Sequence, residues 1–422
     1  MHGSNLRWSA AAEEAARIAE SWNKAGEPGG AIAVFDADRI RSEACGGLAD
    51  LATAAKFSAD TVSRYASITK HVFAAMLVAH PDEIGVDDKL GAHLPFLTGA
   101  TRGVSVGRAL DMTGGLPDLR ETLSHLGVEG ATVSAGPALI DFVARNGAAN
   151  FTAGTEISYS NTGYRLSEHA LRLKGVDFET HLRTRINAKL GIGFHAPEHW
   201  FDPVAKLAPG YWKSGDAWRL STSGMQLSAS GCLTGSVRDL SVWLQALMTD
   251  RGPAQGALAK LSALRHLADG RATDYGLGLA RTTLGSRTLF GHGGSHAGYK
   301  AYFLFDPDAQ AGVALVSNRE DTISFDGALR VMAIVRASLL TGMRTAPRPR
   351  SSGLCSPREM AVIFCSPTVL QAIWTEGSIF TCGGAVTTAG GCTGAGAEAT
   401  QPMRYQEPRS HPIAEHVRGS FW

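Results

Sequence analysis

The N-terminal part of the chain shows a helical pattern followed by two strand patterns. Apolar side chains recur at the spacing of one helix face, at Trp8, Ala11, Ala15, Ile18 and Trp22. The stretch "AGEPGG" ends that helix, because Gly and Pro interrupt helical backbone. The following "GGAIAVF" predicts a buried strand, and "DAD" at 36–38 predicts a turn into a second strand over about 39–45.

The middle of the chain, from about residue 66 to residue 211, changes to helices and loops. "TKHVFAAMLVAH" carries apolar residues at helical spacing. Ser105 precedes "VGRALDM" and Ser134 precedes "AGPALIDFVARN", so both serines are predicted to cap helices. The remainder contains a capped amphipathic helix over 235–248, a closing helix over about 325–340, and strand-like runs: "DYGLGLAR", "RTLFGHGG", "YKAYFLFD" and "GVALVSN".

This order of elements indicates an α+β fold. A helix and two strands come first, and a long helical insertion, a set of strands and a closing helix follow. An antiparallel sheet flanked by helices, with the terminal helices on one face, accounts for that order. We therefore expect one domain over 1–345, with its sheet region at about 1–65 and 218–345 and its helical region at about 66–217.

The C-terminal segment 346–422 differs in composition from the rest. It contains no Lys, Asp or Asn, yet it holds four of the chain's six cysteines and seven of its 17 prolines. Its stretch "CGGAVTTAGGCTGAGAEAT" has no period that would form an apolar face. Two interpretations stay open, a natural disordered tail or a segment translated out of frame, and the nucleotide sequence would distinguish them.

Composition and charge narrow the classes of function. The chain has 422 residues, of which 44% are hydrophobic and 19% charged, as is ordinary for a globular protein with a large core. Its formal net charge of +1 argues against a nucleic-acid partner and against an acidic membrane surface.

The sequence shows no pattern typical of a membrane helix, a signal peptide or a metal site. No apolar run approaches the roughly 18 residues of a membrane helix, so no membrane association is expected. Acidic residues stand in the N-terminal stretch where a signal peptide would be apolar, which favours a cytoplasmic location. The cysteines form neither a Cys-x-x-Cys pair nor a His/Cys cluster, and we expect no metal or other cofactor.

The candidate nucleophile lies in "ASITKHVFAAM", where Ser67 and Lys70 stand three residues apart. On a helix this spacing places both side chains on one face. A lysine buried behind a serine loses proton affinity, so it can serve as that serine's base. The alternative is a capping serine beside a solvated lysine, and this is how we interpret the second such pair, Ser21 and Lys24, at the end of the first helix.

A second motif is "YSN", Tyr159 to Asn161, the chain's one Tyr-x-Asn. It lies in a polar loop just before a helix within the helical insertion. A tyrosine there can relay a proton, and an asparagine amide can hold a substrate carbonyl. The alternative is a loop cap made by Asn161.

A third motif is "GHGG", in which His292 is followed by two glycines on a late strand. Glycines allow a substrate backbone to approach the edge of a strand. His-x-Gly also begins at His125 and at His296, so this triplet is not specific by itself.

A rival nucleophile is Ser105, in the Gly-x-Ser-x-Gly pattern over 103–107. The nucleophile elbow of α/β-hydrolases needs a buried strand immediately before it. The preceding "PFLTGATRG" predicts a loop, so Ser105 fits a helix cap better than an elbow.

The order of the motifs is more specific than any one of them. Ser-x-x-Lys, then Tyr-x-Asn about ninety residues later, then His-x-Gly resembles the penicilloyl serine transferases: serine β-lactamases, penicillin-binding D,D-peptidases, family VIII esterases and D-aminopeptidases. The resemblance spans about residues 10–345 and includes "GGAIAVF", "DMTGGLPD" and "LSASGCLTGSVRDLSVWL". A histidine in the third motif is most similar to the D-aminopeptidases and some esterases.

The resemblance implies a β-lactamase/transpeptidase-like fold and a serine hydrolase that cleaves amide or ester bonds through an acyl-enzyme. The family's catalytic roles fall on Ser67 as nucleophile, Lys70 as base and Tyr159 as proton relay. Its substrate contacts fall on Asn161, His292, Gly294 and Ser295, with an oxyanion hole formed by the amides of Ser67 and Ser295. The expected partners are a small peptide, amide or ester substrate and, at most, a second copy in a homodimer.

D-aminopeptidase activity is favoured, and a family VIII-type esterase or a D,D-carboxypeptidase is the alternative. A binding protein that is acylated without turnover, or an inert remnant, would carry the same residues. The D-aminopeptidases have two further barrel-like domains, one of which sends a loop toward the substrate's amine. Residues 346–422 are too few for both, so we expect small activated esters to be cleaved better than D-aminoacyl amides.

Overall fold

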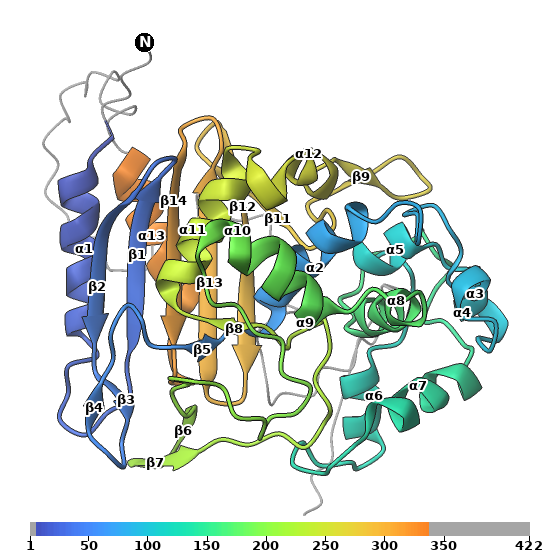
Figure 1. The fold of residues 1–422 in the computed structure, drawn as a ribbon, viewed down its shortest axis with the longest axis horizontal. Coiled ribbons are helices and arrows are strands. Elements are labelled where there is room, and N and C mark those ends of the chain that lie inside the picture. Colours follow the sequence, from blue (N-terminus) through green and yellow to red (C-terminus); the bar gives the residue numbers. More distant parts are fainter. Residues whose placement is uncertain (1–5, 337–422) are drawn as a thin grey trace, which may run out of the picture. The chain divides into compact units, whose positions relative to one another are not determined.

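A six-stranded antiparallel sheet forms the centre of the computed structural model, which describes residues 6–336 (Figure 1). The strand order is β11-β12-β13-β14-β1-β2. The strands are β1 (Gly30–Asp36), β2 (Ile40–Gly46), β11 (Ala280–Leu284), β12 (Arg287–His296), β13 (Tyr299–Asp306) and β14 (Ala311–Ser317). The first strand pairs with the last, from Gly30 opposite Ser317 to Asp36 opposite Ala311, so segments far apart in sequence complete one sheet. The predicted tail, 346–422, lies outside the described residues.

The strand β1 is buried on both faces of the sheet, which explains its unbroken apolar run. Side chains of a strand point alternately to opposite faces. Ala31, Ala33 and Phe35 join the core that also contains α2, whereas Ile32 and Val34 join a second core on the other face.

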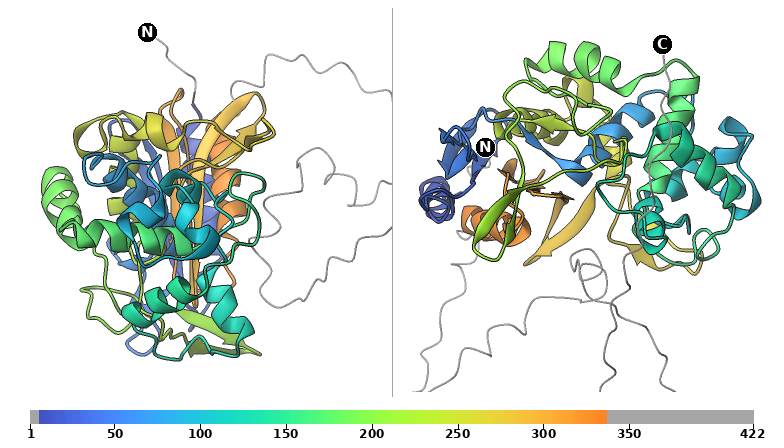
Figure 2. Two further views of the ribbon diagram at one scale, coloured as in Figure 1. Left: turned by 90° about the vertical axis from the view of Figure 1, so that its right-hand side faces the viewer. Right: turned by 90° about the horizontal axis from the view of Figure 1, so that it is seen from below.

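Helices cover both faces of the sheet. The terminal helices α1 (Trp8–Glu20) and α13 (Ser324–Arg336) pack together on one face (Figure 2). The helix α11 (Val237–Met248) covers the other face, against β1 and β14. It begins with a capping box, in which Ser236 Oγ accepts from Asp239 N at 3.1 Å and Asp239 Oδ2 accepts from Ser236 N at 2.9 Å.

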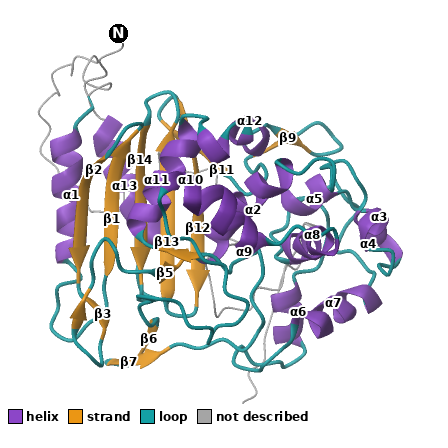
Figure 3. Ribbon diagram, viewed as in Figure 1, coloured by secondary structure: helices purple, strands orange, loops and turns teal. Residues whose placement is uncertain are grey.

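Most of the remaining helices lie to one side of the sheet, and α10 is drawn in front of its strands (Figure 3). They are α2 (Thr69–Val78), α3 (Leu90–His93), α4 (Gly99–Gly103), α5 (Val106–Leu110), α6 (Leu119–His125), α7 (Gly136–Arg145), α8 (Thr162–Leu173), α9 (Phe178–His181), α10 (Ala188–Leu190) and α12 (Ala257–Leu261). Tighter turns occur at Ala66–Ile68, Gly252–Ala254 and, as a π-helical turn, Leu182–Asn187. Short strands complete the described part: β3 (Leu48–Asp50), β4 (Ala55–Lys56), β5 (Ser63–Arg64), β6 (Tyr211–Ser214), β7 (Ala217–Leu220), β8 (Thr234–Gly235), β9 (Arg265–His266) and β10 (Ala272–Thr273).

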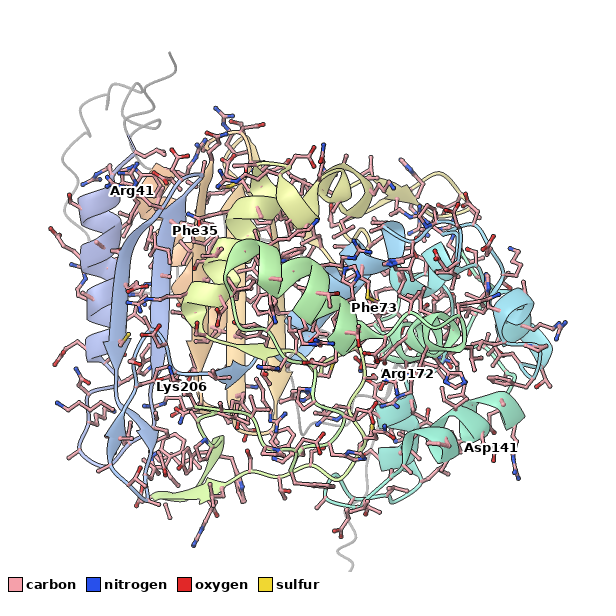
Figure 4. All side chains as sticks on the ribbon, viewed as in Figure 1. Phe35, Arg41, Phe73, Asp141, Arg172 and Lys206 are labelled. Carbon is pink, nitrogen blue, oxygen red and sulfur yellow. The ribbon has the colours of Figure 1, made fainter. Side chains whose placement is uncertain are left out.

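The helix α2 lies entirely in the interior of the protein: every residue from Thr69 to Val78 is buried. Phe73 lies on it in the interior of the molecule, whereas Asp141 of α7 lies at the periphery (Figure 4). His71 Nδ1 donates to Ile68 O at 2.6 Å, and its Nε2 accepts from Trp243 Nε1 at 2.9 Å. Burial lowers the pKa of His71 to about 3, so the neutral ring ties α2 to α11.

The observed fold confirms the predicted α+β class, with one correction among the strands. The run "DYGLGLAR" forms a strand only from Ala280 onward. Gly278 has a φ of +77°, and a Cβ there would lie 2.7 Å from His71 N. Gly278 therefore lets the chain pass directly beside α2, where a side chain would not fit.

One local expectation in the helical region is also wrong. Ser134 does not cap α7, whose N-cap is Ala135, because Gly136 N donates instead to the side chain of Gln226, a partner distant in sequence. The short strand β6 begins at Tyr211, close to the end expected for the helical region. All described residues belong to one compact unit.

Candidate active site

Ser67 lies in a tight turn between β5 and α2, rather than within the helix itself. The preceding Ala66 is buried and has a φ of +50°, which costs an L-residue about 1–3 kcal/mol. Thr69 Oγ1 donates to Ala66 O at 2.6 Å and accepts from Leu233 N at 2.9 Å, so the strained turn is held from both sides. Ser67 keeps part of its surface exposed at this turn.

Lys70 is fully buried and reaches Ser67. Its Nζ lies 3.0 Å from Ser67 Oγ, 2.7 Å from Asn161 Oδ1 and 2.7 Å from the main-chain oxygen of Ser230. Burial lowers the pKa of Lys70 to about 7, and the charge of Asp118 acts in the opposite direction. A large fraction of this amine is therefore neutral near pH 7, as a base must be.

Tyr159 approaches Ser67 from the loop before α8. Its Oη donates to Ser67 Oγ at 2.7 Å, and its ring centroid lies 4.7 Å from Lys70 Nζ. Burial raises the pKa of the Tyr159 phenol, so this residue keeps its proton at neutral pH. It can therefore donate a proton next to the serine oxygen.

Asn161 is oriented by a buried carboxylate. Asp118 Oδ2 accepts from Asn161 N at 2.6 Å and from Asn161 Nδ2 at 2.9 Å. Because a carboxylate only accepts, the amide nitrogen of Asn161 must face Asp118 and its oxygen must face Lys70. Asp118 Oδ1 also accepts from Glu121 N at 3.0 Å and so caps α6.

His292 lies beside Tyr159, with the two ring centroids 6.5 Å apart. It is buried, and both ring nitrogens are engaged: Nδ1 donates to Gly293 O at 2.6 Å and Nε2 accepts from Tyr275 Oη at 2.7 Å. Burial, aided by the charge of Lys70, lowers the pKa of His292 to about 3. The ring is therefore neutral and lies next to the serine–lysine–tyrosine cluster without a free nitrogen.

Gly294 brings β12 against the segment that precedes Ser67. A Cβ at Gly294 would lie 2.0 Å from Tyr65 O and 3.4 Å from the Ala66 Cβ, so a side chain there would separate the two segments. The next residue, Ser295, follows along β12, and its Oγ accepts from Lys300 Nζ at 2.7 Å. The side chain of Ser295 is therefore engaged within the sheet.

The rival serines lie elsewhere. Ser21 is exposed at the end of α1 and donates to Ile18 O at 2.6 Å, and Lys24 is exposed. Ser105 caps α5 by accepting from Arg108 N at 3.3 Å, and the helix α4, not a strand, precedes it. Within residues 6–336, neither hydroxyl forms a hydrogen bond to a lysine or histidine side chain.

Sequence reasoning missed three contacts of the cluster. The carbonyl of Ser230 carries no side-chain signal, although its segment was part of the resemblance. Asp118 stood at the end of the quoted loop "DMTGGLPD" without a role, and Tyr275 lay in the run mistaken for a strand. Only tertiary structure brings these groups to Lys70, Asn161 and His292.

Residues 6–336 provide neither a cluster of metal ligands nor a membrane-spanning helix. Within 6–336, no three His, Cys, Asp or Glu side chains are arranged to hold a metal ion. Over the same range, no helix has the length and apolar character needed to cross a bilayer.

An antiparallel sheet with flanking helices, a serine–lysine pair at the start of a buried helix and a tyrosine on the serine is the arrangement of β-lactamase-like proteins. The sequence profile of the Beta-lactamase family matches residues 15–336. The chain belongs to this family.

Relatives within the family are D-aminopeptidases. The chain is 26% identical to the D-aminopeptidase of Brucella anthropi over 324 residues, which cover 73% of this chain and 59% of that protein. It is 24% identical to the D-aminopeptidase of Gluconobacter oxydans over 302 residues, 69% of this chain and 56% of that protein. The chain therefore spans less than two thirds of the length of these relatives.

Solved structures share the fold. The D-amino acid amidase from Ochrobactrum anthropi SV3, complexed with L-phenylalanine amide, matches with a TM-score of 0.64 at 22% identity, over 79% of this chain and 99% of that one. The octameric penicillin-binding protein homologue from Pyrococcus abyssi matches with a TM-score of 0.62 at 20% identity, over 75% and 74% of the two chains. These likenesses establish the β-lactamase/transpeptidase-like fold.

Proposed function

We propose that the chain is a serine hydrolase that cleaves amide and ester bonds through an acyl-enzyme formed on Ser67. The observation that carries the proposal is the position of Ser67 Oγ, 3.0 Å from Lys70 Nζ and 2.7 Å from Tyr159 Oη. A nucleophilic hydroxyl needs a base within hydrogen-bond distance and a proton donor for the leaving group, and these two contacts supply both.

The first half of the reaction forms the acyl-enzyme. Neutral Lys70 accepts the proton of Ser67 as Oγ bonds to the acyl carbon. The bond to the leaving group then breaks, and the proton taken by Lys70 returns through Tyr159 to the leaving nitrogen or oxygen. The lowered pKa of Lys70 and the raised pKa of Tyr159 suit these directions of transfer.

The second half returns the free serine. Water attacks the acyl carbon, the same groups take and give the proton, and the acid product leaves. In both halves the oxygen of the tetrahedral intermediate is negative, and in our proposal the amides of Ser67 and Ser295 bind it. A donor of this kind contributes about 3–4 kcal/mol in comparable sites. The close contact of Gly294 with Tyr65 supports this placement, because it brings the two amide-bearing segments together.

The substrate that we propose is an N-terminal D-amino acid joined as a peptide, amide or ester. The similarity to curated D-aminopeptidases supports this class, and so does the shared fold with a D-amino acid amidase.

The test is kcat/KM for D-alanyl p-nitroanilide, its L-isomer and p-nitrophenyl acetate on one preparation. We expect the D-isomer to be cleaved in preference to the L-isomer. The ester should be cleaved faster than either anilide, because its leaving group is the better one. Equal rates for the two isomers would exclude selectivity for D-amino acids and would be compatible with the hydrolase mechanism. No cleavage of any substrate would contradict the mechanism.

A further inference from the structure

A largely buried carboxylate of α8 lies behind the proposed site and has no part in the reaction described above. The side chain of Glu168 is 13% exposed, and its Oε2 accepts from Ala229 N at 2.8 Å. Ala229 precedes Ser230, whose main-chain oxygen accepts from Lys70 Nζ at 2.7 Å. The Glu168 carboxylate is therefore bonded to the residue next to the carbonyl that contacts the proposed base.

The segment 228–233 joins several parts of the proposed site. Main-chain hydrogen bonds of 2.8 Å within it form a tight turn. Gly231 O accepts from His296 Nε2 at the end of β12, at 2.7 Å. Leu233 N donates to Thr69 Oγ1 at the start of α2, at 2.9 Å. A shift of this segment would therefore reach both α2 and β12.

The helix α8 carries two groups that set the surroundings of Lys70. Asn161 lies at its N-terminal end, and Asn161 Oδ1 is 2.7 Å from Lys70 Nζ. Glu168 follows seven residues later, close to two helical turns, so both side chains leave the same face of the helix. Two of the three oxygen atoms around the amine are thus positioned from one helix, one directly and one through Ala229.

Space beside the segment makes the contact of Glu168 with Ala229 important. A cavity of about 30 Å³ is lined by Glu168, Ser228 and Cys232 among others. This volume exceeds the roughly 10–15 Å³ that one water molecule needs, so the segment is loosely packed on this side. Without the carboxylate, the N–H of Ala229 would lose its acceptor, and the segment could move toward the cavity.

We propose that Glu168 is a positioning residue of the hydrolase, which through Ala229 holds the Ser230 carbonyl against Lys70 and so fixes the place of the proposed base. The inference rests on the proposed function of Ser67 and Lys70. A carbonyl oxygen that accepts from an ammonium favours the charged form, so loss of this contact should lower the pKa of Lys70.

A change at Glu168 leaves the other groups around the base unaltered. The ionisable groups that act on Lys70 or contact it are Asp118, Arg120, Tyr159, Tyr164, His292 and His296. None of them is replaced in the variants below, so a change in the pKa of Lys70 reports on the contact with Ser230.

The test is the pH profile of kcat/KM for p-nitrophenyl acetate in the unaltered full chain, in Glu168→Ala and in Glu168→Gln. Glu168→Ala should move the midpoint of the rise to lower pH by about one pH unit, the effect of one lost hydrogen bond to a charged group. It should also lower the plateau at high pH on the order of tenfold, because a displaced base transfers the proton less well.

Glu168→Gln should keep the midpoint of the unaltered protein. The contact needs only an acceptor oxygen for Ala229 N, and an amide oxygen supplies one. Burial raises the pKa of Glu168, and either protonation state of the carboxyl offers the same acceptor. A Glu168→Gln profile shifted as far as that of Glu168→Ala would assign the effect to charge and overturn the inference.

Glu198→Ala is the matched control. The Glu198 carboxylate lines the same cavity and lies 2.7 Å from Arg172 Nη1, which is also paired with Glu168, but the carboxylate that accepts from Ala229 N is that of Glu168. Its loss should leave the midpoint unchanged.

A Glu168→Ala profile with the midpoint of the unaltered protein would overturn the inference and leave the proposed function intact, whatever the change in thermal stability. If circular dichroism shows that Glu168→Ala does not fold, Glu168→Asp, whose side chain is one methylene shorter, is held to the same criterion. Absence of ester hydrolysis by the unaltered protein at every pH would overturn both the inference and the proposed function.

Discussion

Among single residues, Lys70 matters most to the proposed reaction, in which it accepts the proton of Ser67. Its amine is buried against three oxygen atoms, those of Ser67, Asn161 and Ser230, and no carboxylate of residues 6–336 bonds to it directly. Burial disfavours the ammonium and is the larger effect on the pKa, whereas the charge of Asp118 favours the ammonium. The residue is thus held near the point at which it can change protonation during the reaction.

The pH dependence of hydrolysis should report this protonation. Because neutral Lys70 is the base, kcat/KM should rise with pH through an apparent pKa of about 7. The charge of Asp118 raises the pKa of Lys70, so Asp118→Asn should move the rise to lower pH. The measurement is kcat/KM for p-nitrophenyl acetate over about pH 5–9 for both proteins. A rate that falls with pH over this range, or a shift of the Asp118→Asn profile to higher pH, would contradict the role of Lys70.

The motifs singled out Ser67, Lys70, Tyr159 and Asn161, which the structure brings together. Their side chains give a signal because the chemistry needs these residue types at these spacings. The orientation of Asn161 had no such signal, since it depends on Asp118 across a tertiary contact. The positive φ of Ala66 was equally hidden, because alanine has no special preference for that conformation.

At the scale of elements, the approach of β12 to the turn before α2 shapes the proposed site. Gly294 allows this approach, since a Cβ there would lie 2.0 Å from a main-chain oxygen of Tyr65. Neither the strand nor the turn can move without losing hydrogen bonds. The strand β12 is paired with β11 and β13, and Thr69 Oγ1 is hydrogen-bonded to Ala66 O and Leu233 N at the turn. An added methyl group must therefore displace one of them.

Gly294→Ala should lower kcat/KM by on the order of 100-fold, the effect of misplacing a reacting group by about 1 Å. The control is Gly103→Ala, because a Cβ at Gly103 meets nothing within 4 Å and its φ is not positive. Circular dichroism and thermal unfolding of both variants distinguish a displaced strand from a failure to fold. Activity of Gly294→Ala equal to that of Gly103→Ala would show that the contact has no part in catalysis.

The elements themselves were largely predictable. Long apolar runs bounded by turns marked β1 and β12–β14, and serine with Asp three residues later marked the start of α11. The predictions of elements were wrong where a contact between residues distant in sequence determines the local structure. Gln226 supplies the contact at the start of α7 that Ser134 was expected to make, and Gly278 bends the chain past α2 where a strand was expected.

At the scale of the whole molecule, the proposed site draws on segments that lie far apart in sequence. Ser67 and Lys70 come from the start of α2, Tyr159 and Asn161 from the loop before α8, and Gly294 from β12 in the sheet (Figure 1). The pairing of β1 with β14 joins the N-terminal strands to the sheet that contains β12. The order of the motifs indicated this convergence only through family resemblance, because spacing alone does not specify which distant segments meet.

The measurement that tests the central claim most directly is covalent labelling of Ser67 by a fluorophosphonate probe, followed by intact-mass and peptide analysis. We predict one label per chain on Ser67, with labelling and ester hydrolysis both abolished in Ser67→Ala. Ser21→Ala and Ser105→Ala should be labelled at the rate of the unaltered protein, because within residues 6–336 neither hydroxyl is hydrogen-bonded to a lysine or histidine side chain. Undiminished labelling of Ser67→Ala, or a label on another serine, would contradict the assignment of Ser67 as the nucleophile.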